Sequence, residues 1–278
     1  MDKKQKIGSQ TAKSGFKNEH IIVAKLNNYQ HDNDAVSWLK YMGYNVEKIT
    51  ELKAFQIPTI INKNNQLIPK GGIGNLEHKK ADGQVQIRLM IDNCLYIENF
   101  SIKKSKTSSD FNQVDKRKVE KYQQMWKFSD NIAHILSLFT GAKNPLEHGY
   151  DKQKRILPKD FSIQEKEELL NFLNRNKVII LNDILIGRGG FSANYMIIAD
   201  YSHERNIQYH IIQTIEIINY ISHFNFEISD KKTTINIADG LVQFQRKGGT
   251  PDPTSLQFKF KPLKILATLG NTRRYSRE

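Results

Sequence analysis

The chain has 278 residues and a formal net charge of +13, because 42 lysines and arginines outnumber 29 acidic residues. With 38% hydrophobic and 10% aromatic residues it can bury a core, which excludes a disordered basic tail. The positive charge favours a polyanionic partner, and DNA or RNA fits best. The alternative is an ordinary basic protein, since charge does not identify a ligand by itself.

Cysteine usage and hydropathy indicate where in the cell the protein is expected. Cys94 is the single cysteine, so an intramolecular disulfide and a cysteine-based zinc cluster are both excluded. It falls in an expected strand, where we expect a buried apolar role. Residues 1–4 lack the apolar stretch of a signal peptide, and no run of about 18 apolar residues predicts a membrane span. We therefore expect a cytoplasmic protein with no membrane contact.

Hydrophobic periodicity and turn residues predict a mixed α and β chain. Helices are expected over residues 14–27, 34–41, 111–128, 130–139, 162–173 and 209–223. Strands are expected over residues 82–90, 94–103, 177–186, 194–199, 226–228, 233–237, 241–246 and 257–260. Ser162 and Glu165 have the spacing of a capping box. Residues 52–80 are expected to form an extended loop or a hairpin insertion, and the last eight residues a loose tail.

Two residues of the expected hairpin carry the chemistry. Asp82 opens the first strand and Lys103 ends the second, with the turn residues 92–93 between them. An acidic residue, a gap that fits a β-hairpin and then x-Ile-Lys is the layout of a metal-dependent phosphodiesterase core. The carboxylate would hold Mg²⁺, and the lysine would steady the attacking water or the charged phosphate. The alternative is an aspartate at a strand start and a surface lysine at a strand end.

Strand alternation places Ser101 and Lys103 on one face and sends the Ile102 side chain into the core. The Ile102 carbonyl would then be free to act as a ligand of hard Mg²⁺. Glu19, on the expected N-terminal helix, is a candidate third carboxylate or oxygen donor of the site. The alternative for Glu19 is a solvated helix glutamate.

A basic segment follows the hairpin, with seven basic and three acidic residues between Lys103 and Lys121. Four residues at the expected helix start are candidate DNA contacts: Phe111, Asn112, Gln113 and Lys116. Side-chain amides can pair with purine edges, lysine reaches guanine O6 and N7, and an aromatic tip can wedge between base steps. The alternative is a solvated basic helix whose phenylalanine packs on its own core.

A second candidate recognition segment lies near the C-terminus. Gln245, Arg246 and Lys247 precede a glycine turn, and Gln257 follows on the next expected strand. Glycine permits close backbone approach to phosphate, although a basic β-turn would look the same. The glycine-rich run around Arg188 lacks the Gly-Lys-Ser/Thr ending of a phosphate loop, so we expect a strand connection with Arg188 as a candidate phosphate contact.

Long segments of the chain resemble a known family. Residues 8–19, 111–116, 122–128, 183–189, 245–249 and 256–259 resemble the Type II restriction endonucleases of the HinP-one-I group. These enzymes cut at GCGC and are relatives of MspI within the PD-(D/E)XK nuclease superfamily. The resemblance covers nearly the whole chain. It implies an α/β fold, with a mixed five-stranded nuclease sheet flanked by helices and a smaller C-terminal recognition part.

The resemblance also divides the chain. It implies a catalytic core with the DNA-contacting helix over residues 1–140, the remaining sheet and the recognition part over 141–270, and a tail over 271–278. Asp82 becomes the metal ligand and Lys103 the catalytic lysine. Phe111 is implied to intercalate in the minor groove while Gln113 and Lys116 read bases. The C-terminal candidates Gln245, Arg246, Lys247 and Gln257 would add base or phosphate contacts.

Two positions depart from the family pattern. Ser101 stands where the family has an acidic or amide residue, and a serine cannot donate a carboxylate to a metal. Residues 55–80 form a longer segment than the family leads us to expect. Asp82, the Ile102 carbonyl, phosphate oxygens and water would then hold the metal, with Glu19 as a further donor.

The expected function is Mg²⁺-dependent hydrolysis of double-stranded DNA at a short palindrome, with GCGC as the expected site and 5′-phosphate ends. Such an enzyme implies a companion DNA methyltransferase that protects host sites; the sequence leaves monomer and dimer open. A competing hypothesis, motivated by Ser101, is a non-cleaving DNA-binding protein on a degenerate nuclease scaffold. A third is a repair nuclease that recognises structure and not sequence.

Overall fold

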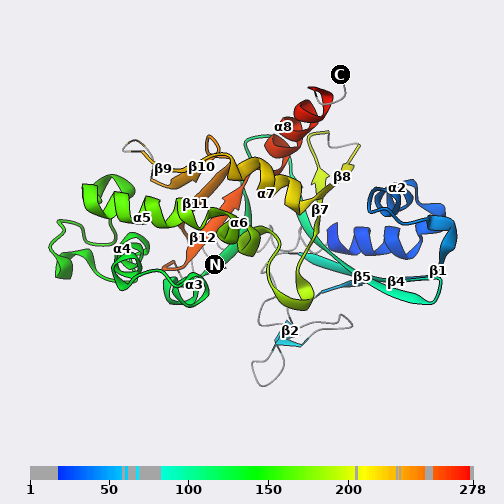
Figure 1. The fold of residues 1–278 in the computed structure, drawn as a ribbon, viewed down its shortest axis with the longest axis horizontal. Helices are drawn as coiled ribbons and strands as arrows, with labels where there is room; N and C mark the ends of the chain where they lie inside the picture. Colours follow the sequence, from blue (N-terminus) through cyan, green and yellow to red (C-terminus); the bar gives the residue numbers. More distant parts are fainter. Residues whose placement is uncertain are drawn as a thin grey trace, which may run out of the picture.

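Two five-stranded β-sheets lie toward opposite ends of an elongated molecule in the computed structural model (Figure 1). The structure describes residues 18–57, 60–61, 67–68, 83–203, 206–229, 231, 233–247 and 253–275, and only the backbone of residues 60–61, 67–68 and 271–275. Asp82 and most of the segment 55–80 lie outside the described residues. Within that segment a short ribbon pairs β2 (Ile60–Ile61) with β3 (Leu67–Ile68).

The first sheet is mixed and has the strand order β1-β4-β5-β7-β8. Its strands are β1 (Ile49–Gln56), β4 (Gln84–Ile91), β5 (Cys94–Ser105), β7 (Tyr195–Asp200) and β8 (Gln208–Gln213). β5 runs parallel to β7, and every other neighbouring pair is antiparallel. The predicted mixed five-stranded sheet is confirmed. The expectation of a loop from residue 52 is wrong up to Gln56, because β1 pairs with β4 along its whole length.

One face of the first sheet is covered by two helices, over residues 18–27 and in α2 (Asn33–Tyr41). Leu26 and Trp38 from these helices share a buried cluster with Ile87, Phe100 and Ile102 from the sheet. Each such side chain stabilises the fold by roughly 1.5–3 kcal/mol when it leaves water. The cluster fixes the strands of the expected catalytic hairpin against the N-terminal helix.

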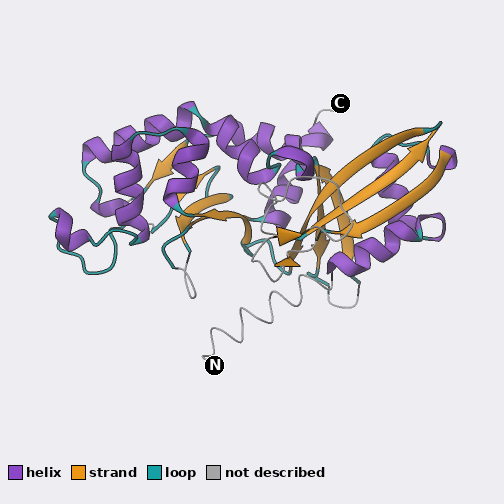
Figure 2. Ribbon diagram, turned by 90° about the horizontal axis from the view of Figure 1, so that it is seen from below, coloured by secondary structure: helices purple, strands orange, loops and turns teal. Residues whose placement is uncertain are grey.

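The second sheet is antiparallel and has the strand order β6-β12-β11-β10-β9. Its strands are β6 (Asn112–Arg117), β9 (Phe226–Ile228), β10 (Ile235–Ile237), β11 (Val242–Arg246) and β12 (Leu256–Phe260). Val114, Phe244 and Phe258 point from it into a large buried cluster shared with the helices. Figure 2 shows these helices gathered around the small sheet, while the first sheet stands apart at the other end. Each sheet contains strands from before and from after residue 140. The predicted boundary at residue 140 between a catalytic core and a recognition part therefore stays a prediction.

The remaining helices surround the second sheet or join the two sheets. They are α3 (Val119–Trp126), α4 (Asp130–Thr140), α5 (Ile163–Arg175), α6 (Lys177–Leu185), α7 (Thr214–Ser222) and α8 (Pro262–Tyr275). Single 3-10 turns occur at Tyr29–His31, Val46–Lys48, Pro145–His148, Pro158–Asp160 and Gly189–Phe191. The capping box of Ser162 and Glu165 is confirmed. No helix in the described part of the chain is long and apolar enough to cross a bilayer.

Four sequence predictions of secondary structure are wrong in whole or in part. The expected helix over residues 111–128 begins only at Val119, because residues 112–117 pair as β6 with β12, a partner far along the chain. The expected strand over residues 177–186 is the helix α6, which contacts α7 and buries Ile180, Leu181, Ile184 and Leu185 while Val178 and Ile179 are exposed. The expected helix over residues 209–223 is β8 followed by α7, and α8 runs into the segment expected as a tail.

The tip of the β4–β5 hairpin corrects the expectation for Cys94. Asp92 and Asn93 have φ angles of 50° and 65°, the left-handed pair that a tight hairpin turn requires and that Asp and Asn tolerate. Cys94 follows directly at the tip and is exposed. The strand pattern was interpreted correctly, but the tip of this hairpin projects beyond the core.

A buried carboxylate holds α6 to α3 and to the loop that follows α6. Asp183 accepts the Trp126 indole N–H at 2.8 Å and the Arg188 Nε at 2.7 Å. A second Arg188 nitrogen donates to the same carboxylate and to the Met125 carbonyl. The Asp183 side chain is 4% exposed, so its charge depends on these donors for compensation.

We predict that Asp183→Ala lowers the free energy of unfolding by about 2 kcal/mol, because it leaves the buried Trp126 indole N–H without its acceptor and removes the counter-charge of the partly exposed Arg188. Urea unfolding followed by circular dichroism measures this as a lower midpoint at constant slope. Glu167→Ala removes an exposed carboxylate from α5 and should change stability by less than about 0.5 kcal/mol. Equal effects of the two substitutions would contradict the structural role of Asp183.

Candidate active site and nucleic-acid interface

Lys103 lies near the end of β5 and is 3% exposed. Its Nζ donates a hydrogen bond to the Gln113 carbonyl at 2.9 Å. Strand alternation puts Ser101 on the same face, while Ile102 points into the opposite cluster, as predicted. The alternative of a surface lysine is wrong, because this amine is held inside the protein by a named acceptor.

The other side of the site is the start of β4. Asp82 lies outside the described residues, and Gly83 is the first residue described after it. The Ile102 N–H donates to the Gly83 carbonyl at 2.9 Å. In an antiparallel ladder the N–H and the carbonyl of one residue point to the same neighbouring strand. The Ile102 carbonyl therefore faces the chain next to residue 83, as a ligand role would require.

Glu19 reaches the same point from the N-terminal helix. Its side chain is buried, and its Oε1 lies so close to Gly83 that a Cβ atom at residue 83 would overlap it. The other oxygen, Oε2, accepts a hydrogen bond from the Gln56 amide at the end of β1. The alternative of a solvated glutamate is wrong. The contact of Gln56 with Glu19 could not be predicted from the sequence, because only the pairing of β1 with β4 brings Gln56 there.

Ser101 is 1% exposed, and its hydroxyl has no hydrogen-bond partner among the described residues. Gln84 pairs with it across the β4–β5 ladder, and the Gln84 Oε1 is also buried without a partner. Buried oxygens are almost always satisfied by protein, water or an ion. Ser101 and Gln84 therefore place two buried oxygens on the Lys103 face of the sheet, and oxygen is the donor that hard divalent cations prefer.

The spacing of possible metal ligands within the described residues does not by itself define a metal site. No group of three or more His, Cys, Asp or Glu side chains gathers among them. The expected ligand Asp82 lies outside that set, and the other donors next to residue 83 are a carboxylate, a hydroxyl and a carbonyl. These oxygen donors suit a hard divalent cation that is held by few protein carboxylates and completed by water or phosphate.

Three side-chain amides on the same face hold a neighbouring loop. Gln84 donates to the Phe191 carbonyl at 2.9 Å. Gln86 donates to Asn99, which in turn donates to the carbonyls of Gly190 and Ser192. The loop after α6 is thereby fastened to the strands that carry Ser101 and Lys103. Arg188 begins this loop, but its guanidinium is committed to Asp183, so its contact with phosphate stays a prediction.

The candidate base-reading residues lie on a strand and not on a helix. In β6, Lys116 pairs with Gln257 of β12, and Gln257 pairs in turn with Gln245 of β11. The Gln257 amide also donates to the Gln113 side chain. Residues 113, 116, 245 and 257 therefore lie on the face opposite Phe244 and Phe258, which are buried in the core. The structure brings together two segments that the sequence analysis named separately.

The turn between β5 and β6 is built by Asp110. Its carboxylate accepts the backbone N–H groups of Lys106 and Thr107 at 2.7 and 3.0 Å. Burial alone would raise the pKa of Asp110, but these hydrogen bonds lower it overall. The carboxylate therefore stays charged at neutral pH and keeps the turn fixed. Phe111 follows, half-buried, with the Lys261 Nζ 4.7 Å from its ring centroid. Asn112 begins β6.

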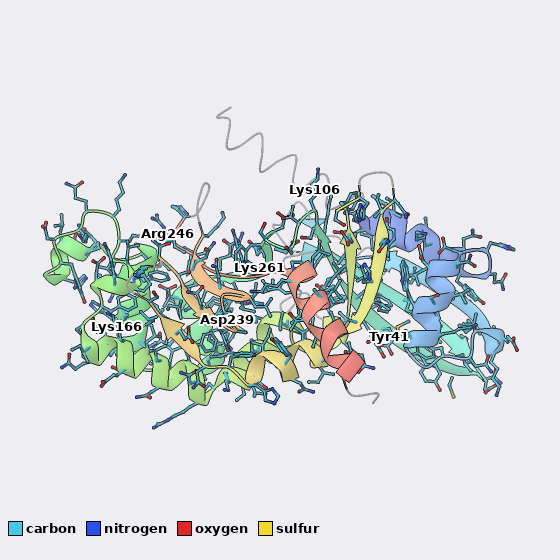
Figure 3. All side chains as sticks on the ribbon, turned by 90° about the horizontal axis from the view of Figure 1, so that it is seen from above. Tyr41, Lys106, Lys166, Asp239, Arg246 and Lys261 are labelled. Atoms are coloured by element: carbon cyan, nitrogen blue, oxygen red, sulfur yellow. The ribbon has the colours of Figure 1, made fainter. Side chains whose placement is uncertain are left out.

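The turn between β5 and β6 and the end of β11 lie on the same side of the molecule. Figure 3 places Lys106 and Arg246 toward one long side and Lys166 toward the opposite side. Arg246 is fixed at the end of β11, where its Nε donates to the Pro253 carbonyl at 2.8 Å. The Lys247 amide donates to the Ser255 carbonyl at 2.8 Å, so the last of the C-terminal candidates is also anchored.

Comparison with known proteins identifies the fold and the family. The model of the R.HinP1I restriction endonuclease matches residues 72–266, which is more than half of the chain. The chain belongs to the R.HinP1I restriction endonuclease family. It is accordingly a site-specific deoxyribonuclease, and restriction endonucleases of this kind generally use divalent metal ions.

A solved structure adds an independent comparison of the fold. The restriction endonuclease MspI, in a crystal structure with its cognate DNA, is similar with a TM-score of 0.58 over 93% of each chain. The two sequences are 14% identical, so this likeness concerns the fold. No curated protein matches the chain in sequence. The predicted restriction-endonuclease-like α/β fold is confirmed.

We predict that Gly83→Ala pushes the Glu19 carboxylate out of place, since the new methyl group would occupy the position of its Oε1. Overpacking of this kind costs about 1–3 kcal/mol of folding free energy, and a 1 Å displacement in a catalytic site costs roughly 100-fold in rate. Urea unfolding and a DNA cleavage assay measure the two effects. Combining it with Glu19→Ala should restore stability without restoring cleavage.

The matched control is Gly270→Ala in α8, where a Cβ atom would meet nothing within 4 Å. This substitution should leave cleavage unchanged and raise stability by up to about 1 kcal/mol, the helix propensity difference. Full activity and full stability of Gly83→Ala would show that Glu19 does not lie against residue 83.

Proposed function

We propose that this restriction endonuclease binds double-stranded DNA and hydrolyses one phosphodiester per strand with Mg²⁺, leaving 5′-phosphate ends. The observation that supports this best is the buried Lys103 amine on the strand whose Ile102 N–H bonds to Gly83, the residue against which the Glu19 carboxylate also lies. Two elements supply these groups, β5 and the helix over residues 18–27. A carboxylate at residue 82 would complete an oxygen-lined site beside a buried amine.

In the proposed site Asp82 and the Ile102 carbonyl hold the metal, with Glu19 as a further carboxylate. When bound, Mg²⁺ neutralises charge on the phosphate and lowers the pKa of a coordinated water. Lys103 points its ammonium, fixed by the Gln113 carbonyl, at the charge that develops on the attacked phosphate. Ser101 supplies a hydroxyl that can bind a water molecule in place of the family's acidic or amide side chain.

We further propose that the outer face of the second sheet reads the DNA sequence, with GCGC as the expected site. Gln113, Gln245 and Gln257 offer amide groups that both donate and accept, and Lys116 suits guanine O6 and N7. Phe111 lies at the start of this strand, where an aromatic ring can enter a base step. Arg246, Lys247 and Asn112 flank the same face, so binding should weaken steeply with salt.

The biological setting follows from cleavage of a short site. A companion DNA methyltransferase would protect host sites, and the enzyme would act in the cytoplasm, where the DNA is. The working unit is a monomer or a dimer, which gel filtration with and without DNA would decide.

We predict discrete fragments when unmethylated phage DNA is digested with Mg²⁺, and intact DNA when EDTA replaces the metal. Sequencing the fragment ends gives the site and the overhang together, and ends at GCGC are the expected result. Ends at another fixed sequence would overturn the proposed specificity. DNA retained in a gel shift without any cleavage would support the degenerate scaffold, and random nicking would support a repair nuclease.

Lys103→Met keeps the apolar stem and removes the ammonium. We expect the cleavage rate to fall by at least about 100-fold, the usual effect of removing one charge-stabilising donor, while DNA binding persists. Asp82→Asn should have the same phenotype. Lys40→Met removes an exposed lysine from α2 and should leave the rate within about twofold. A Lys103→Met enzyme that cuts at the normal rate would rule out the proposed role.

A further inference from the structure

A basic pocket of about 370 Å³ opens where β11 and β12 end, beside the proposed sequence-reading face. Arg246 and Lys247 line it from the end of β11, and Lys259 and Gln257 from β12. Its remaining cation is Arg155, from the segment between Pro145–His148 and Pro158–Asp160. Arg155 lies outside both segments that the sequence suggested as DNA contacts.

Four positively charged side chains are brought together in this pocket. Burial, followed by the neighbouring Arg246, lowers the pKa of Arg155. Burial also lowers the pKa of Lys259. None of the described residues that line the pocket is acidic. Like charges brought together at a partly desolvated site favour an anionic ligand, because the ligand would supply the missing counter-charge.

The donors are held in place before any ligand arrives. Arg155 lies with its guanidinium carbon 5.9 Å from the Phe139 ring centroid, and the amide of the next residue, Ile156, donates to the Leu138 carbonyl at 3.2 Å. The Arg246 Nε is bonded to the Pro253 carbonyl. Donors fixed in this way lose little conformational entropy on binding.

The number of donors distinguishes two kinds of DNA contact. A guanine edge presents two acceptors, O6 and N7, and one bidentate arginine satisfies both. Two guanidinium groups and two ammonium groups exceed that capacity. A phosphodiester has two charged oxygens, each able to accept several hydrogen bonds, and arginine forks match its geometry. The pocket therefore suits a phosphate better than a base.

We propose that this pocket binds one backbone phosphate of DNA and that Arg155 is a DNA-contacting residue. The inference rests on the proposed function, since it takes DNA to be the ligand. Gln257 belongs both to the pocket and, through its bond to Gln113, to the sequence-reading face. A phosphate held there sets the register of the duplex on the strands that read it.

The test uses the full chain carrying Arg155→Gln, with Lys259→Gln as a second variant that leaves the Phe139 contact intact. Dissociation constants are measured in EDTA for two duplexes, one with the cleavage site and one with that site scrambled, at several NaCl concentrations. Each variant should bind both duplexes about tenfold more weakly at low salt. The slope of log K against log salt should fall by about 1 in magnitude.

Arg175→Ala is the matched control, because it removes an exposed arginine from the last turn of α5, outside the pocket. It should leave both affinities and the slope unchanged. Unaltered binding by both pocket variants would overturn the proposal, and so would a loss confined to the duplex with the site, which indicates base reading. If the wild type binds neither duplex, the proposed function fails before the pocket is tested.

A further arm separates DNA from a small anion. Inorganic phosphate is titrated against wild type and Arg155→Gln while the melting temperature is followed. Under the proposal, weak stabilisation of the wild type accompanies the DNA defect of the variant. Stabilisation by phosphate together with normal DNA binding by both variants would overturn it in favour of a site for a small phosphorylated ligand.

Discussion

The hydrogen bond from the Lys103 amine to the Gln113 carbonyl joins the two halves of the molecule. Lys103 belongs to the first sheet and Gln113 to the second, only ten residues further on. A buried ammonium cannot give up its acceptor without a large cost in free energy. The position of the proposed catalytic lysine is thus tied to the backbone of the proposed recognition strand, and any ligand that shifts β6 also shifts the amine.

The second sheet can act as a firm platform because its two faces differ so completely. On the inner face Phe244 stacks on Phe258 with ring centroids 4.3 Å apart. On the neighbouring strand, Asp115 is buried and accepts the Tyr122 hydroxyl at 3.0 Å, which locks β6 to α3. The outer face carries amides and cations with no apolar side chain at the paired positions 113, 116, 245 and 257. Rigid apolar packing beneath and polar groups above is the arrangement that places hydrogen-bonding groups accurately.

The sequence predicts what is decided locally. The β4–β5 hairpin follows from a turn at Asp92 and Asn93, and the caps of the helices follow from their own few residues. β6 could not be predicted, because a short polar strand becomes a strand only through β12, which lies about 140 residues away. Gln56 and Arg155 were missed for the same reason: nothing in their neighbourhood along the chain distinguishes them, and only the fold brings them to Glu19 and Arg246.

Ser101 can be understood from the same geometry. The position lies at the level of Gln84 on a buried face, so a carboxylate there would need compensation by a metal or a donor. Glu19 brings a buried carboxylate to the adjacent Gly83 from a different element, and the absence of a Cβ atom at residue 83 makes the room. In the proposed site, the negative charge that the family pattern takes from the strand comes from the N-terminal helix. If that proposal holds, the serine does not mark a decayed centre, because the Glu19 carboxylate is supplied by the N-terminal helix.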